Sequence, residues 1–191
     1  MKSLRERFEE EYAAVSIPAD NKRGFRVIYR YYAPWYIWDL PEKQLSARKN
    51  HLLIISVSGL LPYLAAGLQD TDINRMTVPV IFNIIALCAY ILELFAVFRF
   101  RSAKYKTDRT TYQSVDRTMR SIPLIRACCL LMTDITGICS RNFSIPDVSA
   151  AAALLGNLIC AVLAFYIFYD YRKIPFRTEK NRLLQEDQKL L

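Results

Sequence analysis

The sequence predicts an all-α, polytopic integral membrane protein with four transmembrane helices arranged as two hairpins. Three observations predict this fold: four long apolar runs, short turns between paired runs, and a strong bias of basic residues to one side. The chain of 191 residues is 53% hydrophobic and 23% charged, but the charges are concentrated between the apolar runs. Because the runs are apolar all round, they differ from the one-sided stripes of a soluble helical bundle.

The predicted spans cover residues 52–68, 76–98, 122–139 and 148–169. About 20 helical residues, at ~1.5 Å rise each, cross a hydrocarbon core of ~30 Å. We expect a transmembrane bundle within 51–172, between a cytosolic segment (1–50) and a cytosolic tail (173–191). Pro62 is expected to kink the first span, because proline lacks the N–H that a helix interior needs.

The basic residues predict the orientation of the spans. Ten Lys and Arg residues precede the first span, seven lie in the loop 99–120, and six lie in the tail. The two short turns carry one each, and the last, Arg126, lies within the third span. This bias predicts that both termini are cytoplasmic. The net charge of +8 then reflects topology and attraction to anionic headgroups. It does not indicate nucleic-acid binding. The first apolar run begins only at Leu52, so no signal peptide is expected.

Amphipathic and interfacial segments are expected on the cytosolic side. Residues 1–17 predict a helix, with a capping box (Ser3 and Glu6) and an apolar stripe that includes Tyr12 and Val15. A further helical start lies near Asp39, just ahead of the first span. Short helices are also expected around 112–119 and after Pro175.

The segment 21–38 interleaves basic and aromatic residues. Such a pattern occurs in single-stranded nucleic-acid sites, where bases stack on aromatic rings. Here the segment directly precedes a membrane span, where aromatic and basic residues favour the headgroup layer. We therefore expect an interfacial segment bent at Pro34. Its expected anchors are Trp35, Tyr36, Trp38, Arg26 and Arg30.

Two charges are expected to lie at matching depth in neighbouring spans. Glu93 lies five residues before the cytosolic end of the second span, and Arg126 lies about as far from the cytosolic end of the third. An intramembrane Arg costs roughly 2.5–3.5 kcal/mol on insertion scales, and pairing reduces that cost. We hypothesise an ion pair between Glu93 and Arg126. The alternative is that each side chain reaches the cytosolic interface separately.

Asp134 lies nearer the outer side and has no basic residue opposite it within a span. With Thr133 and either Asn83 or Asn157 it could line a small polar cavity and act as an ion or proton site. The alternative is a carboxylate near a span end that reaches water.

The fourth span carries a row of small residues at intervals of four, formed by Ala152, Gly156, Cys160 and Ala164. Such rows let helix backbones approach closely. The five cysteines fall within or beside the apolar runs and are expected to behave as small apolar residues. No metal or cofactor site is predicted, and no catalytic spacing is present, so we do not expect an enzyme.

The sequence therefore favours a non-enzymatic subunit or scaffold of a membrane complex, in a multi-pass membrane location with both termini cytoplasmic. The expected partners are the bilayer, with anionic headgroups on the cytosolic side, and either another protein or further copies of this chain. The alternative function is a small oligomeric transporter or channel that uses Asp134 or Glu93.

Overall fold

A computed structural model describes residues 6, 11–20, 24–140 and 147–181. The protein is mostly helical (69%). Four helical stretches are long and apolar enough to cross a membrane, which confirms the prediction at that level. The expectation of an all-α fold is wrong in one respect, because the described residues also form five short strands in two small sheets.

The elements follow one another in a simple order. They are β1 (Tyr12–Pro18), β2 (Phe25–Tyr31), β3 (Trp35–Trp38), α2 (Glu42–Ser58), α3 (Leu60–Gly67), η1 (Ile73–Arg75), α4 (Thr77–Ser102), β4 (Lys106–Thr107), α5 (Arg109–Ser140), α6 (Val148–Arg172) and β5 (Phe176–Glu179). Helices α2 and α3 together form the first candidate span, and they meet at Gly59.

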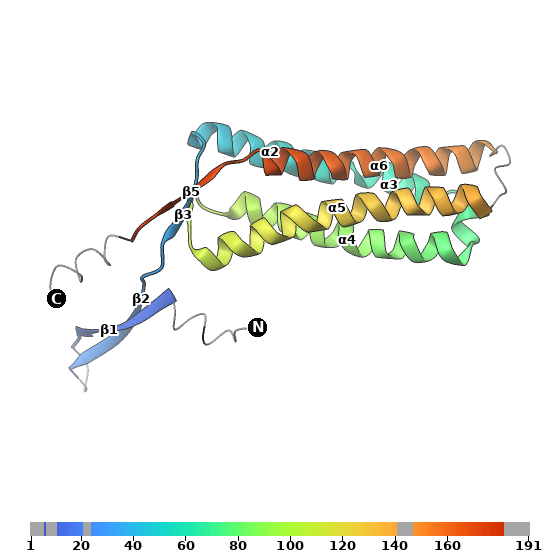
Figure 1. Ribbon diagram of the computed structural model, residues 1–191. Helices are drawn as coiled ribbons and strands as arrows, with labels where there is room; N and C mark the ends of the chain where they lie inside the picture. The colour runs from blue at the N-terminus through green and yellow to red at the C-terminus, as the bar shows by residue number, and fades with distance from the viewer. Residues whose placement is uncertain (1–5, 7–10, 21–23, 141–146, 182–191) are drawn as a thin grey trace.

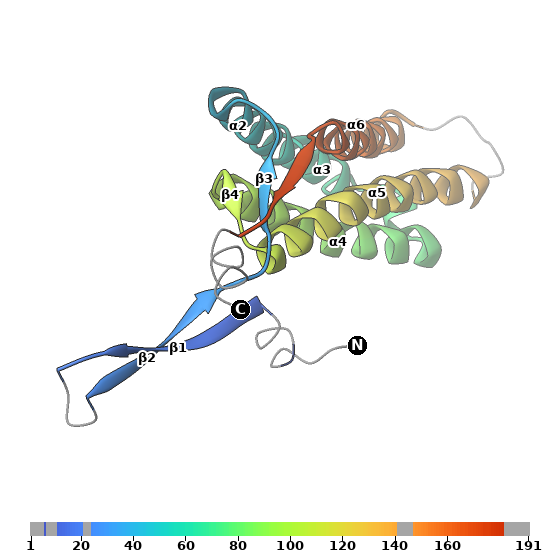
Figure 2. The ribbon, with the colours of Figure 1, turned by 60° about the vertical axis from the view of Figure 1, so that its left-hand side comes forward.

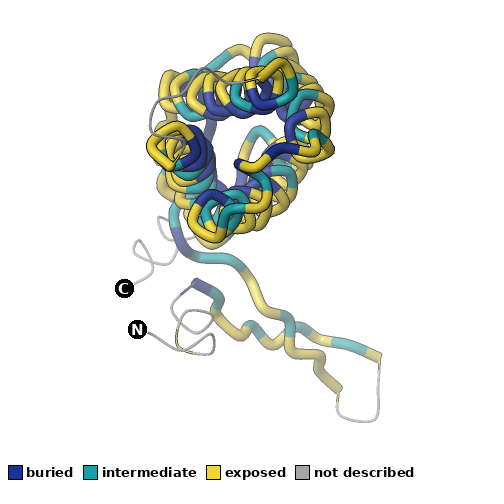
Figure 3. The backbone as a smooth tube through the Cα atoms, turned by 90° about the vertical axis from the view of Figure 1, so that its right-hand side faces the viewer, coloured by how far each residue is buried: buried dark blue, intermediate teal, exposed yellow. Residues whose placement is uncertain are grey.

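The four helical stretches run roughly along one axis and form a ring in cross-section (Figures 1 and 3). Helix α4 packs against α5, and α5 packs against α6; α2 and α3 close the ring between α4 and α6. All the strands lie at one end of this bundle (Figures 1 and 2). We call this end, where α2 and α5 begin and α4 and α6 end, the basic end.

Helices extend past the predicted apolar runs at the basic end. Helix α2 begins at Glu42, ten residues before Leu52, and α5 begins at Arg109, well before the predicted third span. The short helix expected around 112–119 is therefore the first part of α5 and not a separate element. It faces inward, since Tyr112, Val115 and Met119 are all buried.

Strands β1 and β2 form an antiparallel hairpin in which Val15 lies opposite Ile28. Gly24 has a φ of 72°, a left-handed conformation that costs a glycine little. Strand β3 is the centre of the second sheet and pairs with β4 and β5, so this sheet joins three distant parts of the chain.

Two helices predicted outside the spans are wrong in the described residues. Tyr12–Pro18 is a strand, although the sequence predicts a helix through residue 17, and the earlier part of that helix lies mostly outside the described residues. Phe176–Glu179 is also a strand, although a helix is expected after Pro175. Each of these two segments pairs with a strand rich in β-branched and aromatic residues. This pairing stabilises the strand more than the local sequence pattern favours a helix.

The core has two parts. Near the basic end, aromatic residues pack around Trp38, whose ring lies 5.2 Å from that of Phe100 and 5.3 Å from that of Tyr112. Farther along the bundle, the core is built of small residues, including Ala86, Cys160 and Ala164.

Candidate functional site

Glu93 of α4 and Arg126 of α5 form a direct ion pair inside the bundle. Arg126 Nη1 lies 2.9 Å from Glu93 Oε1, and the exposed fraction is 1% for Arg126 and 0% for Glu93. The Arg126 guanidinium also lies over the Tyr90 ring, at 4.3 Å from the ring centroid. The structure thus brings together the two charges that the sequence places at equal depth, and it keeps both of them away from the surface.

Ser56 of α2 joins the first span to this pair. Its hydroxyl donates a hydrogen bond to Glu93 Oε1 at 3.0 Å, and its backbone carbonyl accepts one from the Tyr90 hydroxyl at 2.6 Å. Helical spacing predicts that Tyr90 shares a face with Glu93, whereas Ser56 was not predicted to belong to this site. The available signal for Ser56 was a lone polar side chain on an otherwise apolar helix face.

Helix α6 completes the arrangement through Cys160. The Cys160 carbonyl accepts a 3.4 Å hydrogen bond from Arg126 Nη2, and the Cys160 thiol donates to the Gly59 carbonyl at 3.4 Å. All four candidate spans therefore contribute to one buried cluster. We call Ser56, Tyr90, Glu93, Arg126 and Cys160 the polar centre.

Two atoms of the polar centre have no hydrogen-bond partner within the described part of the chain: Glu93 Oε2 and Arg126 Nε. The ion pair itself is nonetheless complete, because each group has a partner of opposite charge. In a low-dielectric interior, losing one partner costs more than the intact pair contributes.

Asp134 makes a different kind of contact. Its Oδ1 accepts a 2.9 Å hydrogen bond from Asn157 Nδ2 on α6, and the two residues are 9% and 3% exposed. Thr133 is buried, but its hydroxyl donates to the Cys129 carbonyl of its own helix. The structure thus joins two of the four residues expected around this site.

Asn83 is not part of that group. Its side-chain oxygen accepts a 2.8 Å hydrogen bond from the Tyr63 hydroxyl, and both residues line a separate cavity of about 210 Å³ with Asn74. Of the two asparagines expected as alternatives beside Asp134, Asn157 contacts it, whereas Asn83 turns toward α3.

The row of small residues on α6 packs inside the bundle, with one exception. A Cβ on Gly156 would lie 2.9 Å from the Pro62 carbonyl oxygen and 2.9 Å from Ala66 Cβ, so α3 and α6 touch backbone to backbone. Cys160 and Ala164 are buried as well, whereas Ala152 is exposed. The packing face is completed by Ala153 and Ala161, which belong to a parallel row.

The residues expected to anchor the chain in the headgroup layer occupy three different settings. Trp38 is 2% exposed and belongs to the aromatic core, so it cannot serve as an exposed anchor. The Tyr36 ring stacks on the Tyr112 ring, with 4.5 Å between the ring centroids. The Lys106 ammonium lies over the Trp35 ring, 5.4 Å from its centroid. Arg26 and Arg30 are exposed on β2.

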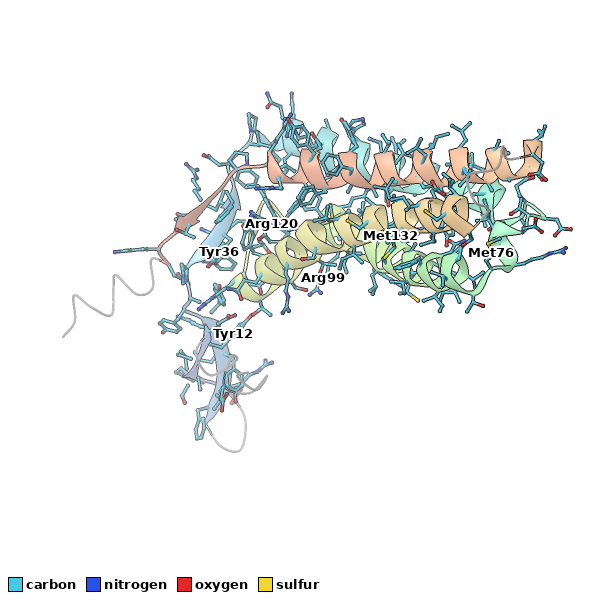
Figure 4. All side chains as sticks on the ribbon, turned by 45° about the vertical axis from the view of Figure 1, so that its right-hand side comes forward. Tyr12, Tyr36, Met76, Arg99, Arg120 and Met132 are labelled. Atoms are coloured by element: carbon cyan, nitrogen blue, oxygen red, sulfur yellow. The ribbon has the colours of Figure 1, made fainter. Side chains whose placement is uncertain are left out.

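A second cavity, of about 500 Å³, lies at the basic end where the hairpin meets the loop between α4 and α5. Tyr12, Tyr31, Trp35, Lys104 and Lys106 are among its lining residues. Burial raises the pKa of Tyr31 to about 12. Figure 4 shows Tyr12 and Tyr36 at this end of the molecule and Met76 at the opposite end.

Among the described residues, no group of three or more His, Cys, Asp or Glu side chains is arranged to hold a metal ion. A comparison of the chain with protein-family models, with curated proteins and with solved structures finds no match.

Proposed function

We propose that the chain is a non-enzymatic integral membrane protein with both termini on the cytoplasmic side, and that it serves as a subunit or scaffold of a membrane complex. The outer surface of the bundle supports the membrane location. Only 28–39% of the most apolar part of each span is buried inside the protein, so large apolar side chains cover the outside. Phe95 and Leu61, for example, are 69% and 75% exposed.

The proposed orientation rests on the basic residues, because 23 of the 26 lie in the sequence before the first span, between the second and third spans, or after the fourth span. Two of them make aromatic contacts that suit the headgroup layer at the end of α6. The Arg172 guanidinium lies 5.4 Å from the Phe168 ring centroid, and the Lys173 ammonium lies 4.1 Å from that of Tyr169. Anionic headgroups on the cytoplasmic side are the lipid partners we propose.

The polar centre is the observation that favours a subunit over a transporter. Glu93 and Arg126 neutralise each other and are almost wholly enclosed by helices. Neither the 500 Å³ cavity nor the 210 Å³ cavity is lined by either residue. A transported ion would have to break this pair, whereas a structural role uses it as it stands.

A specific observation supports a transporter as the second candidate. Within the part of the chain that the structure describes, Asp134 is buried beside a neutral amide and not beside a cation, and Asn157 Oδ1 has no hydrogen-bond partner. An unpaired intramembrane carboxylate is typical of ion and proton pathways.

Purification separates the two candidates. The tagged full-length chain would be isolated from its host in a mild detergent, with a tagged, unrelated four-span protein as the control. Mass spectrometry and a native-mass determination would follow. A different protein recovered at fixed stoichiometry, or a stable assembly without flux in liposomes, supports the subunit. Ion or proton flux that disappears in Asp134→Asn overturns it in favour of the transporter.

A further inference from the structure

The β1–β2 hairpin lies beyond the basic end of the bundle and extends sideways past its outline (Figures 1 and 3). Its sheet has two strands in the described part of the chain. A two-stranded hairpin is marginally stable in water unless something covers it. The apolar side chain of Val27 on β2 is nevertheless 45% exposed. A partner strand that covers the hairpin would therefore bury apolar surface.

The height of the hairpin excludes the bilayer as that partner. The hairpin base is fixed to the start of α5, where the Tyr31 hydroxyl accepts a 2.8 Å hydrogen bond from the Arg109 N–H and the Thr110 hydroxyl donates one of 2.7 Å to Glu11. Thr110 lies 12 residues before Ile122, or about 18 Å along the helix. The headgroup layer extends only about 5–8 Å beyond the hydrocarbon core.

The two edges of the hairpin differ in charge. Strand β1, from Tyr12 to Pro18, has no charged residue, whereas β2 carries Arg26 and Arg30. Soluble proteins protect exposed strand edges with charges, with prolines or with a cover. The edge of β1 between Ala13 and Ile17 has neither charge nor proline. It is the edge suited to pairing with another strand.

We infer that β1 pairs antiparallel with β1 of a second copy of this chain, which forms a four-stranded sheet in the order β2, β1, β1, β2. This inference rests on the proposed function, because it requires two copies in one membrane. Such copies share an orientation, so their two-fold axis follows the membrane normal. Strands related by this axis must lie crosswise to it. In the view along the bundle axis the hairpin extends sideways from the bundle (Figure 3), and it also slants away from the end of the bundle (Figure 1).

Charge explains why a second copy fits β1 and not β2. Antiparallel pairing of identical strands places the central residue opposite its own counterpart, and the residues before it opposite those after it. In β1 this brings together Ala14, Val15 and Ser16, which are uncharged. In β2 it would bring like charges together at Arg26 and Arg30, and like charges directly opposite one another are destabilising.

The test measures the dimerisation of the full-length chain in lipid nanodiscs and mild detergent by native mass spectrometry. We expect a dimer. Ser16→Lys places a like charge in both paired strands and should weaken dimerisation about tenfold. Val27→Lys adds the same charge to the residue opposite Ser16 on β2 and should leave the dimer intact. Mixing Ser16→Lys with Ser16→Glu should restore a heterodimer.

Three outcomes would overturn the β1 pairing: a monomeric parent chain, a Ser16→Lys dimer as tight as the parent, or equal weakening by Val27→Lys. Thermal unfolding of each variant identifies any general loss of folding. A monomer bound to a different protein would overturn the pairing and leave the subunit proposal standing. A β1-paired dimer with Asp134-dependent flux would overturn the subunit proposal and leave the pairing standing.

Discussion

The half of the bundle near the basic end and the half farther from it are held together by different means. The first combines an aromatic core around Trp38 with the ion pair between Glu93 and Arg126, which lies toward the middle of the bundle. The second relies on close contacts of small residues, such as Gly156 against Ala66, and on the neutral contact of Asn157 with Asp134. In the first half, charge makes the helix packing specific, because α4 and α5 must align so that Glu93 and Arg126 meet. In the second half, the shapes of the small residues make the packing specific.

The largest loss of stability is expected when only one partner of the ion pair between Glu93 and Arg126 is removed. Arg126→Gln leaves the Glu93 carboxylate buried without a counter-charge, and we expect a loss of about 3–5 kcal/mol in the free energy of unfolding. The measurement is thermal unfolding of purified protein in detergent, together with the yield of monodisperse protein. Glu93→Gln should also lower the yield.

The double variant Glu93→Gln/Arg126→Gln sharpens this prediction. If the two groups are coupled, the double variant should recover part of the stability that Arg126→Gln loses. Strictly additive losses would show that the charges act independently, contrary to the ion pair.

An intermediate loss of stability is expected when a larger side chain is introduced at the close contact between α3 and α6. Gly156→Val places a side chain against the Pro62 carbonyl and Ala66, so it should separate α3 from α6 and cost about 1–3 kcal/mol. Ala152→Val, four residues earlier on the exposed face, is the control and should change stability by less than about 0.5 kcal/mol. Equal melting temperatures for the two variants would contradict the close approach of these helices.

The smallest effect is expected at Asp134. Asp134→Asn keeps the side-chain shape and a hydrogen bond to Asn157, so the cost should stay below about 1 kcal/mol. Under the subunit proposal, ion and proton flux of proteoliposomes should not differ between this variant and the parent chain. A stability loss as large as that of Arg126→Gln would show that Asp134 is held by a charge, as Glu93 is.

The spans could be predicted from the sequence because their signal is local: each run is apolar all round and long enough to cross a bilayer. The juxtaposition of Glu93 and Arg126 also followed from local information, since two antiparallel helices of known length fix the relative depth of their residues. Helical spacing likewise predicted that Gly156 and Cys160 share a packing face.

The strands could not be predicted in the same way, because their stability comes from pairing. Residues 12–17 fit a helical stripe, yet they pair with β2, whose alternating Phe25–Tyr31 sequence was the overlooked signal. Strand β5 depends on β3, more than 130 residues earlier in the chain. The burial of Trp38 has the same origin, since β3 carries it onto the end of the bundle.

The ion pair also has a consequence for how the protein is made. On the proposed topology, Glu93 enters the bilayer with the first helical hairpin, ahead of Arg126 in the third span. The first hairpin must therefore exist for a time with an uncompensated acid, which Ser56 alone contacts through a hydrogen bond. When the third span inserts, Arg126 pairs with Glu93. The first two spans therefore reach their final packing only when the second half of the chain joins them.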